Sequence, residues 1–382
     1  MLKALNLALL CILLCCSCDE AGEQQHWTIP HAQAFSFYPL AWKELLILPV
    51  RQNGQDGIAA VSRQQGTLRW MIADSSFANL YYNCTPYIAQ GKLLLPAGKQ
   101  LWCIDLATGA LLWKDVQPYA GESHVFGIKD ICYRTYNFTA ERRAKVIRYS
   151  LTEGAHQIVH EVTYAPGQQF ILRTPKPYPC GVDACWLSST LRYEPGKAHG
   201  SDVLQRDGDG LHRYQIYPPN RKGKGAAQAP LLDGLRAYWM VGEELVCYDM
   251  QNRAECWRTE LPAGQLSSRL HQSGNLIYAA CEDHRLYCLR SEDGQIKWVL
   301  PGAGTPSRLR QVGQQLFFVG GNDATLYQVN TGTERLDGQY RLRQQDGRIA
   351  RPFYVDEGVL LLSGNRQWHA IPMSSRAQWL EH

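Results

Sequence analysis

Two segments far apart in the chain share one pattern: residues 101–113 read LWCIDLATGALLW, and residues 286–298 read LYCLRSEDGQIKW. In each, Trp follows an aliphatic residue by twelve positions, and Gly stands four residues before the Trp. The alternation before the Gly is that of a half-buried strand, and a Gly that adopts positive φ suits a tight hairpin turn. The pattern therefore predicts two antiparallel strands joined by a short turn.

Six further copies extend this pattern over the whole chain. Residues 58–70 and 245–257 keep the spacing, although Arg253 takes the Gly position of the second. Weaker copies end at residues 158, 214, 336 and 379, and the copy ending at 336 is expected to have a turn shorter by two residues. Another predicted strand pair precedes each copy, so one unit has four strands and about forty residues. We therefore predict an all-β, eight-bladed β-propeller of four-stranded antiparallel blades, with an irregular insertion around 159–202.

The composition agrees with this fold and excludes some functions. The 382 residues include 33 Gly, 11 Trp and 20 Tyr, a set that suits turns and strands. Charged residues are 19%, too few for a coiled coil. The formal charge of +4 is too small to indicate a nucleic-acid partner.

The first residues have the features of an export signal. Residues 1–18 read MLKALNLALLCILLCCSC, in which Lys3 precedes an apolar run. The run is shorter than the roughly 20 residues of a membrane-spanning helix, and it fits a signal peptide. Cys18 follows a small residue at the polar boundary, which resembles the site where bacterial lipoproteins are cleaved and lipidated. Cys16 is the alternative anchor, and an ordinary cleaved signal is the second alternative.

These features divide the chain into three parts. We predict a lipoprotein signal peptide at 1–17, a tether at 18–26 that begins with the lipid anchor on Cys18, and a single propeller domain at 27–382. The segment 25–37 is expected to supply a strand to the last blade and so to close the ring. Closure removes the free sheet edges that invite aggregation.

The repeat resembles that of the PQQ-type β-propeller family. In that family the Trp at the end of the fourth strand helps to dock one blade onto the next. The resemblance implies this role for five Trp residues, with Gly in the turns of three copies: Trp70, Trp113, Trp257, Trp298 and Trp379, with Gly66, Gly109 and Gly294. Behind a lipoprotein signal, such a propeller is most similar to the BamB-like lipoproteins of the outer-membrane β-barrel assembly machine.

The resemblance implies a non-enzymatic, monomeric scaffold without cofactor. The resemblance implies a protein partner such as the barrel-assembly complex. It also implies a place at a membrane, the outer membrane facing the periplasm or the cell surface. The first alternative is a quinoprotein dehydrogenase that uses PQQ and calcium. Those enzymes are longer and carry an adjacent-cysteine disulfide over the cofactor, whereas the one adjacent pair here is Cys15–Cys16, inside the signal. The second alternative is a ligand-sensing surface lipoprotein.

We predict no catalytic or metal-binding residue. Cysteines at equivalent positions of three repeats are expected to be small buried hydrophobes, because such positions lie far apart in a ring: Cys103, Cys247 and Cys288. Residues 281–288 (CEDHRLYC) would place their two cysteines on adjacent strands, so we expect no zinc site there. A disulfide is expected between Cys180 and Cys185, with a metal knuckle as the alternative. Residues 207–210 (DGDG) predict a hairpin turn in preference to a calcium loop, which would need a later acidic ligand.

Overall fold

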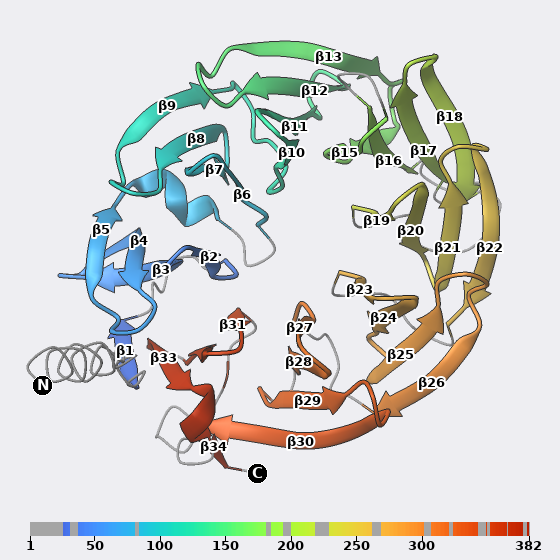
Figure 1. The fold of residues 1–382 in the computed structure, drawn as a ribbon. Helices are drawn as coiled ribbons and strands as arrows, with labels where there is room; N and C mark the ends of the chain where they lie inside the picture. Colours follow the sequence, from blue (N-terminus) through green and yellow to red (C-terminus); the bar gives the residue numbers. More distant parts are fainter. Residues whose placement is uncertain are drawn as a thin grey trace, which may run out of the picture.

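The computed structural model shows a ring of eight antiparallel sheets (Figure 1). It describes residues 26–30, 37–80, 84–180, 185–193, 200–217, 229–261, 269–301, 307–320, 324–342, 349, 352–364, 366–376 and 380–381. Regular structure in these ranges is almost entirely short strands, with the 3-10 turns η1 (Ser75–Asn79) and η2 (Met373–Ser375). The prediction of an all-β, eight-bladed propeller is confirmed.

The first four blades follow the order of the chain. Blade 1 contains β2 (Leu40–Trp42), β3 (Leu45–Gln52), β4 (Gln55–Ser62) and β5 (Leu68–Ile72). Blade 2 contains β6 (Tyr87–Ala89), β7 (Lys92–Ala97), β8 (Gln100–Asp105) and β9 (Leu111–Val116). Blade 3 contains β10 (Phe126–Ile128), β11 (Ile131–Phe138), β12 (Arg143–Ser150) and β13 (His156–Thr163). Blade 4 contains β14 (Gln169–Leu172), β15 (Lys176–Pro177), β16 (Trp186–Tyr193), β17 (Gly200–Asp207) and β18 (Gly210–Tyr217).

The remaining blades complete the ring. Blade 5 contains β19 (Leu231–Asp233), β20 (Arg236–Val241), β21 (Glu244–Asp249) and β22 (Ala254–Glu260). Blade 6 contains β23 (His271–Ser273), β24 (Leu276–Ala280), β25 (Arg285–Arg290) and β26 (Ile296–Pro301). Blade 7 contains β27 (Arg310–Val312), β28 (Gln315–Val319), β29 (Leu326–Asn330), β30 (Arg335–Leu342) and β34 (Leu380–Glu381). Blade 8 contains β31 (Phe353–Val355), β32 (Val359–Ser363), β33 (Gln367–Pro372) and β1 (Trp27–Pro30).

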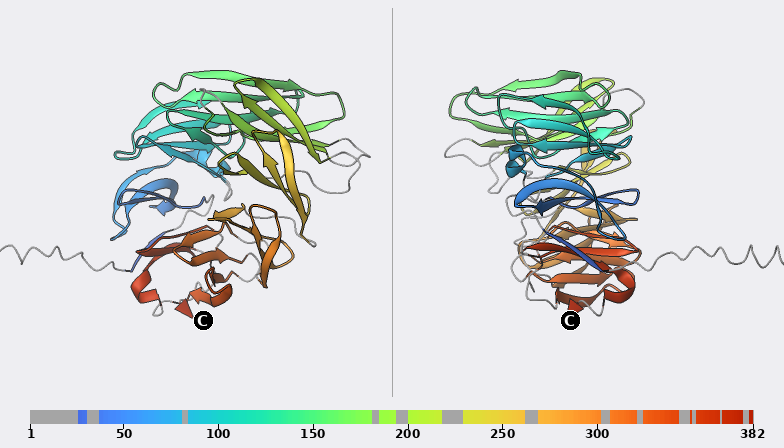
Figure 2. Two further views of the ribbon diagram at one scale, coloured as in Figure 1. Left: turned by 45° about the vertical axis from the view of Figure 1, so that its right-hand side comes forward. Right: turned by 90° about the vertical axis from the view of Figure 1, so that its left-hand side faces the viewer.

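The N-terminal strand closes the ring, as the sequence predicts. β1 pairs antiparallel with β33, with Trp27 opposite Ala370, so the first and last parts of the chain lie side by side (Figure 2). The copy that ends at residue 379 was expected to form the fourth strand of this blade, and that expectation is wrong. Because β1 already occupies the outer edge of β33, the chain end pairs instead with β30 of blade 7 through β34.

The turn of blade 7 also differs from its prediction. Gln328 pairs with Gly338 and Val329 with Leu336, which is the register of Cys288 with Trp298 in blade 6. The turn therefore has its full length and is not shorter by two residues. The residue with positive φ in the turn is Glu334, at 57°, and not Gly332.

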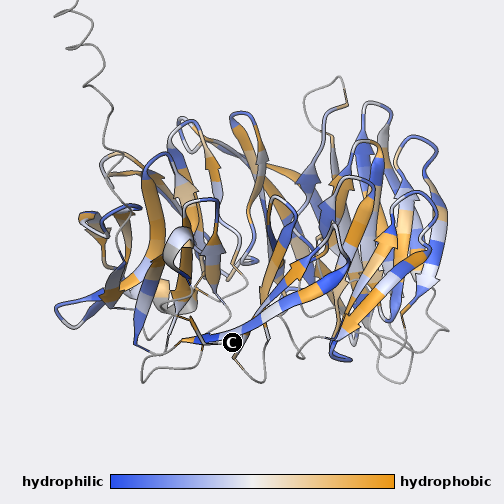
Figure 3. Cartoon of the chain, turned by 60° about the horizontal axis from the view of Figure 1, so that its bottom comes forward, coloured by the Kyte–Doolittle hydropathy of each residue, from blue (hydrophilic) through white to orange (hydrophobic). Residues whose placement is uncertain are grey.

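The core lies between neighbouring blades. Each sheet buries apolar residues on both faces of its middle strands, and these pack against the next sheet; Ile47 and Ile58 of blade 1 share one cluster with Leu93 and Leu95 of blade 2. All four side chains are fully buried. Figure 3 shows the same division, with apolar residues along the strands and polar residues at the turns. No helix in the described ranges is long and apolar enough to cross a membrane.

Candidate functional site at the ring axis

The Trp residues of the outer strands lie against the turn of the following blade. Trp70 of β5 faces Gly109 so closely that a Cβ on this glycine would lie 2.7 Å from the indole Cδ2. Its indole N–H also donates to the Leu106 carbonyl at 2.9 Å. The positive φ of Gly109, 75°, turns the chain back at this point, and the missing side chain makes room for the indole.

Two further Trp residues with a predicted docking role repeat this arrangement. Trp113 covers Gly154 of blade 3 and donates to the Leu151 carbonyl at 3.1 Å. Trp257 covers Gly294 of blade 6 and donates to the Ser291 carbonyl at the same distance. Every one of these pairs joins two consecutive blades.

The remaining predicted positions depart from this arrangement. Gly66 faces Trp27 of β1, whose indole N–H donates to the Arg63 carbonyl at 3.1 Å, so Trp27 joins the last blade to the first. The sequence analysis missed Trp27, because its strand stands at the opposite end of the chain from its blade. The indole N–H of Trp298 finds no hydrogen-bond partner among the described residues. Cys18 and Trp379 lie outside the described residues.

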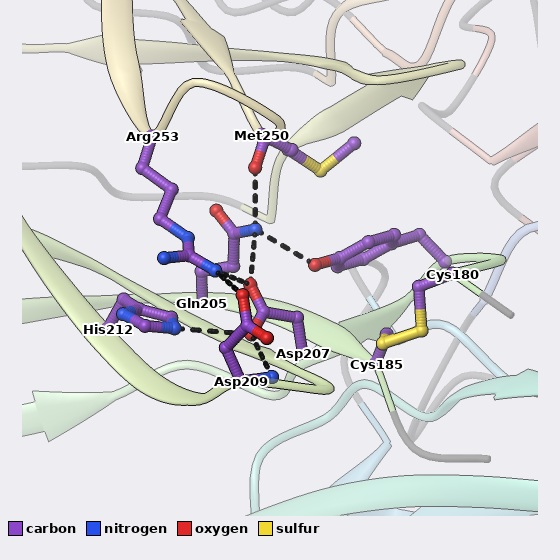
Figure 4. The surroundings of a disulfide bond; sticks show 9 residues. Cys180, Cys185, Gln205, Asp207, Asp209, His212, Met250 and Arg253 are labelled. Atoms are coloured by element: carbon purple, nitrogen blue, oxygen red, sulfur yellow. Dashed lines mark hydrogen bonds and ion pairs between the residues drawn. A yellow bond between two sulfur atoms is a disulfide. The ribbon is translucent and has the colours of Figure 1, made fainter. Parts of the chain in front are cut away.

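The junction between blades 4 and 5 uses charge in place of a Trp–Gly pair. Arg253, in the Gly position of blade 5, donates to Asp207 at 3.0 Å and to Asp209 at 2.7 Å (Figure 4). The two aspartates belong to the two-residue hairpin in which Asp207 pairs with Gly210, as predicted for this turn. Among the described residues no group of three or more His, Cys, Asp or Glu could hold a metal ion.

The cysteines form one disulfide and several buried thiols, as the sequence predicts. Cys180 and Cys185 form a disulfide beside this junction (Figure 4). Cys103, Cys247 and Cys288 are fully buried and unbonded. Burial raises the pKa of the Cys288 thiol to about 12, so it is neutral at any ordinary pH.

A cluster that the sequence analysis did not identify lies at the centre of the ring. It is built from a position that recurs in five blades, two residues before the innermost strand: Tyr38, Thr85, His124, Arg269 and Arg308. Innermost strands surround the axis in Figure 1, so their equivalent ends converge there. The detectable signal was a local repeat, since residues 268–274 read SRLHQSG and residues 307–313 read SRLRQVG.

Two arginines of this cluster reach across the axis. Arg269 of blade 6 donates to the Thr85 hydroxyl of blade 2, on the opposite side of the ring, and to His124 Nδ1 at 3.2 Å. Arg308 of blade 7 donates to the same hydroxyl at 3.2 Å and to the Cys84 carbonyl at 2.9 Å. The two guanidinium groups therefore converge on one neutral hydroxyl group.

These contacts also define the state of His124. A guanidinium only donates hydrogen bonds, so Nδ1 of His124 must be an unprotonated acceptor. The same nitrogen accepts a hydrogen bond from the Thr85 hydroxyl, 3.1 Å away. Burial, followed by the positive charge of Arg269, lowers the pKa of His124 well below its usual value. His124 is therefore neutral at pH 7, and the charge of this cluster comes from its two Arg residues.

Two more cations lie beside these arginines. Arg310 of β27 lies over the ring of Tyr354, 6.0 Å from its centre, and its Nε is buried without a hydrogen-bond partner among the described residues. Lys176 of β15 donates to the Pro230 carbonyl at 3.2 Å. We call the four side chains of Arg269, Arg308, Arg310 and Lys176 the axial basic cluster.

The charges of the axial basic cluster destabilise one another. Burial, together with the charge of Arg269, lowers the pKa of Lys176 to about 8. Burial also lowers the pKa of Arg308 to about 10, and the charge of Arg310 acts in the same direction. All four residues nevertheless keep part of their surface exposed. The cluster thus presents N–H donors and positive charge, which are the groups that recognise carboxylates and phosphates.

The fold defines the class of protein: this chain is an eight-bladed β-propeller protein. Its C-terminal half, residues 202–381, matches the family model described as outer membrane protein assembly factor BamB. No curated protein sequence matches the chain.

Solved structures share the fold at low sequence identity. BamB from Moraxella catarrhalis is 12% identical, with a TM-score of 0.56, over 91% of this chain and 98% of that one. Sqt1 from Saccharomyces cerevisiae is 8% identical, with a TM-score of 0.61 and the same two coverages. A europium-containing methanol dehydrogenase is 11% identical, with a TM-score of 0.57, over 91% of this chain and 84% of that one. At such identities these likenesses concern the fold alone.

Proposed function

We propose that this chain is a non-enzymatic, membrane-anchored scaffold that binds protein partners during assembly of outer-membrane β-barrel proteins. The observation that carries the proposal is the match of residues 202–381 to the BamB assembly-factor family. A lipid on Cys18 would hold the propeller at the outer membrane, on the periplasmic side or at the cell surface. No cofactor takes part in this function.

The geometry supports a rigid binding platform. Trp–Gly contacts join consecutive blades, β1 closes the ring, and Arg269 and Arg308 join opposite sides of it. A scaffold needs such a frame, because loops that are held rigidly lose less conformational entropy on binding.

The second candidate, a quinoprotein dehydrogenase, fits these residues poorly. The disulfide of the described residues joins Cys180 to Cys185, five positions apart, and not the adjacent cysteines of those enzymes. Two acidic residues drawn in its surroundings in Figure 4, Asp207 and Asp209, are engaged by Arg253. The described residues therefore do not fit PQQ and calcium. Tight binding of PQQ with calcium to the purified protein, measured by titration calorimetry, would reverse this conclusion.

The decisive experiment is crosslinking of the native protein in its own membrane, with the attached proteins identified by mass spectrometry. We expect a component of the barrel-assembly complex, and we expect deletion of the gene to lower the levels of outer-membrane β-barrel proteins. A Cys18→Ser variant is the matched control, since it keeps the propeller and loses the anchor. Capture of an unrelated complex, or of lipid alone, would contradict the assembly role and favour a sensing lipoprotein.

A further inference from the structure

We propose that the axial basic cluster binds an acidic segment of a protein partner, through carboxylates that contact Arg310 and its neighbouring cations. This inference rests on the proposed scaffold function and adds to it a place on the propeller and a chemistry of recognition. It concerns the centre of the ring, whereas a scaffold could equally use its rim.

The arrangement of the cations is the first argument. Arg269, Arg308, Arg310 and Lys176 come from blades 4, 6 and 7, so they were brought together by ring closure and do not belong to one solvated strand. Arg269 and Arg308 both donate to the Thr85 hydroxyl; Arg269 also donates to the His124 ring, and Arg308 to the Cys84 carbonyl. These three acceptors are neutral. A carboxylate would be a stronger acceptor than any of these.

Arg310 supplies the second argument. Its guanidinium lies over Tyr354, and its Nε is enclosed without a hydrogen-bond partner among the described residues. A buried N–H donor without an acceptor is unfavourable, so a ligand that supplies an acceptor at this point gains from it. The charge of Arg310 also helps to lower the pKa values of Arg269, Arg308 and His271.

The number of charges indicates the kind of ligand. A small anion would neutralise one or two of the four cations and leave the rest repelling one another. Successive Asp or Glu side chains on one flexible segment can neutralise several cations at once, while the backbone of the segment follows the ring centre. The binding energy would include the relief of the repulsion that lowers the pKa values of Arg308 and Lys176.

The test uses the full-length protein in detergent and a fluorescein-labelled hexa-aspartate peptide, with binding measured by fluorescence anisotropy. Arg310→Met removes the guanidinium and its charge and keeps an unbranched side chain in place of the aliphatic part, and we expect it to weaken binding about tenfold or more. Arg69→Met is the matched control, because Arg69 is exposed on the outer strand of blade 1. We expect it to change the affinity less than about twofold, since exposed charges contribute little.

Several results would overturn the proposal. Equal affinity of the peptide for the two variants would place the binding elsewhere, and absence of peptide binding would reject an acidic segment. Inorganic phosphate or citrate that binds with the same sensitivity to Arg310→Met, while the peptide does not bind, would identify a small-anion site instead. If Arg310→Met still captures the membrane partner in the crosslinking experiment, the scaffold function stands and this inference fails.

Discussion

The contact between Trp70 and Gly109 can be tested by replacing this glycine with alanine. Gly109 has a φ of 75°, and an added Cβ would lie 2.7 Å from two indole atoms and 2.9 Å from the Cβ of Trp70. The Trp70 side chain is rigid and buried, so it cannot swing away as the end of a flexible chain could. The substitution therefore forces the indole out of its place between blades 1 and 2.

The expected loss of free energy of unfolding in Gly109→Ala is the sum of a backbone term and a packing term. A left-handed backbone conformation costs an alanine about 1–2 kcal/mol. Displacement of the indole breaks its buried hydrogen bond to the Leu106 carbonyl and loosens its packing, which costs about 2–3 kcal/mol more. Gly109→Ala should therefore lower the free energy of unfolding by about 3–5 kcal/mol.

Gly313→Ala is the matched control. Gly313 also has positive φ, 56°, but an added Cβ would meet nothing within 4 Å. Gly313→Ala should therefore lower the free energy of unfolding only by the cost of the left-handed backbone conformation, about 1–2 kcal/mol. Both variants are compared with the wild type by guanidinium-induced unfolding, followed by Trp fluorescence and circular dichroism.

A double-mutant cycle identifies the cause. Trp70→Gly removes both the indole and the Cβ that the new Cβ strikes, so Gly109→Ala should cost no more than Gly313→Ala in that background. A coupling energy of about 2–3 kcal/mol is expected between the two positions. Equal destabilisation by Gly109→Ala and Gly313→Ala in the wild-type background would refute the docking argument, and so would an additive cycle.

Three other substitutions test ring closure and the buried cations. Trp27→Ala should cost about 3 kcal/mol and speed hydrogen exchange in β33, because β1 holds the outer edge of that strand; unchanged exchange would contradict closure by β1. Arg134→Met should lower the free energy of unfolding, measured with denaturant, by about 3–5 kcal/mol, since the fully buried guanidinium donates to the carbonyls of Gly98 and Glu122. An unchanged free energy of unfolding would mean that water replaces the guanidinium. Lys176→Met should stabilise the protein at pH 7. The native pKa of Lys176 lies below its unfolded value, so the wild type gains stability as pH rises from about 8 to 10.5 and the advantage of the variant should shrink over that window; a constant difference would contradict the lowered pKa.

The repeat shows how far local pattern determines this fold. Twelve-residue spacing to Trp, with Gly in the turn, is enough to predict strands, hairpins and blade number, because each hairpin is encoded within one short segment. Where the local pattern was weak, the prediction was wrong. The turn of blade 7 is not shorter by two residues, because Glu334 adopts the positive φ and Gly338, not Leu336, stands in the Trp position.

The tertiary structure alone decided which distant residues meet. Trp27 and Gly66 are in contact because β1 belongs to the last blade, and Arg269 meets Thr85 because blades 6 and 2 face each other across the axis. No local pattern carries this information, since contacts across a closed ring depend on the number of blades and on their register. By itself, the sequence determined the blade; closure of the ring determined the axial basic cluster, because only eight docked blades bring four cations from three of them to one place.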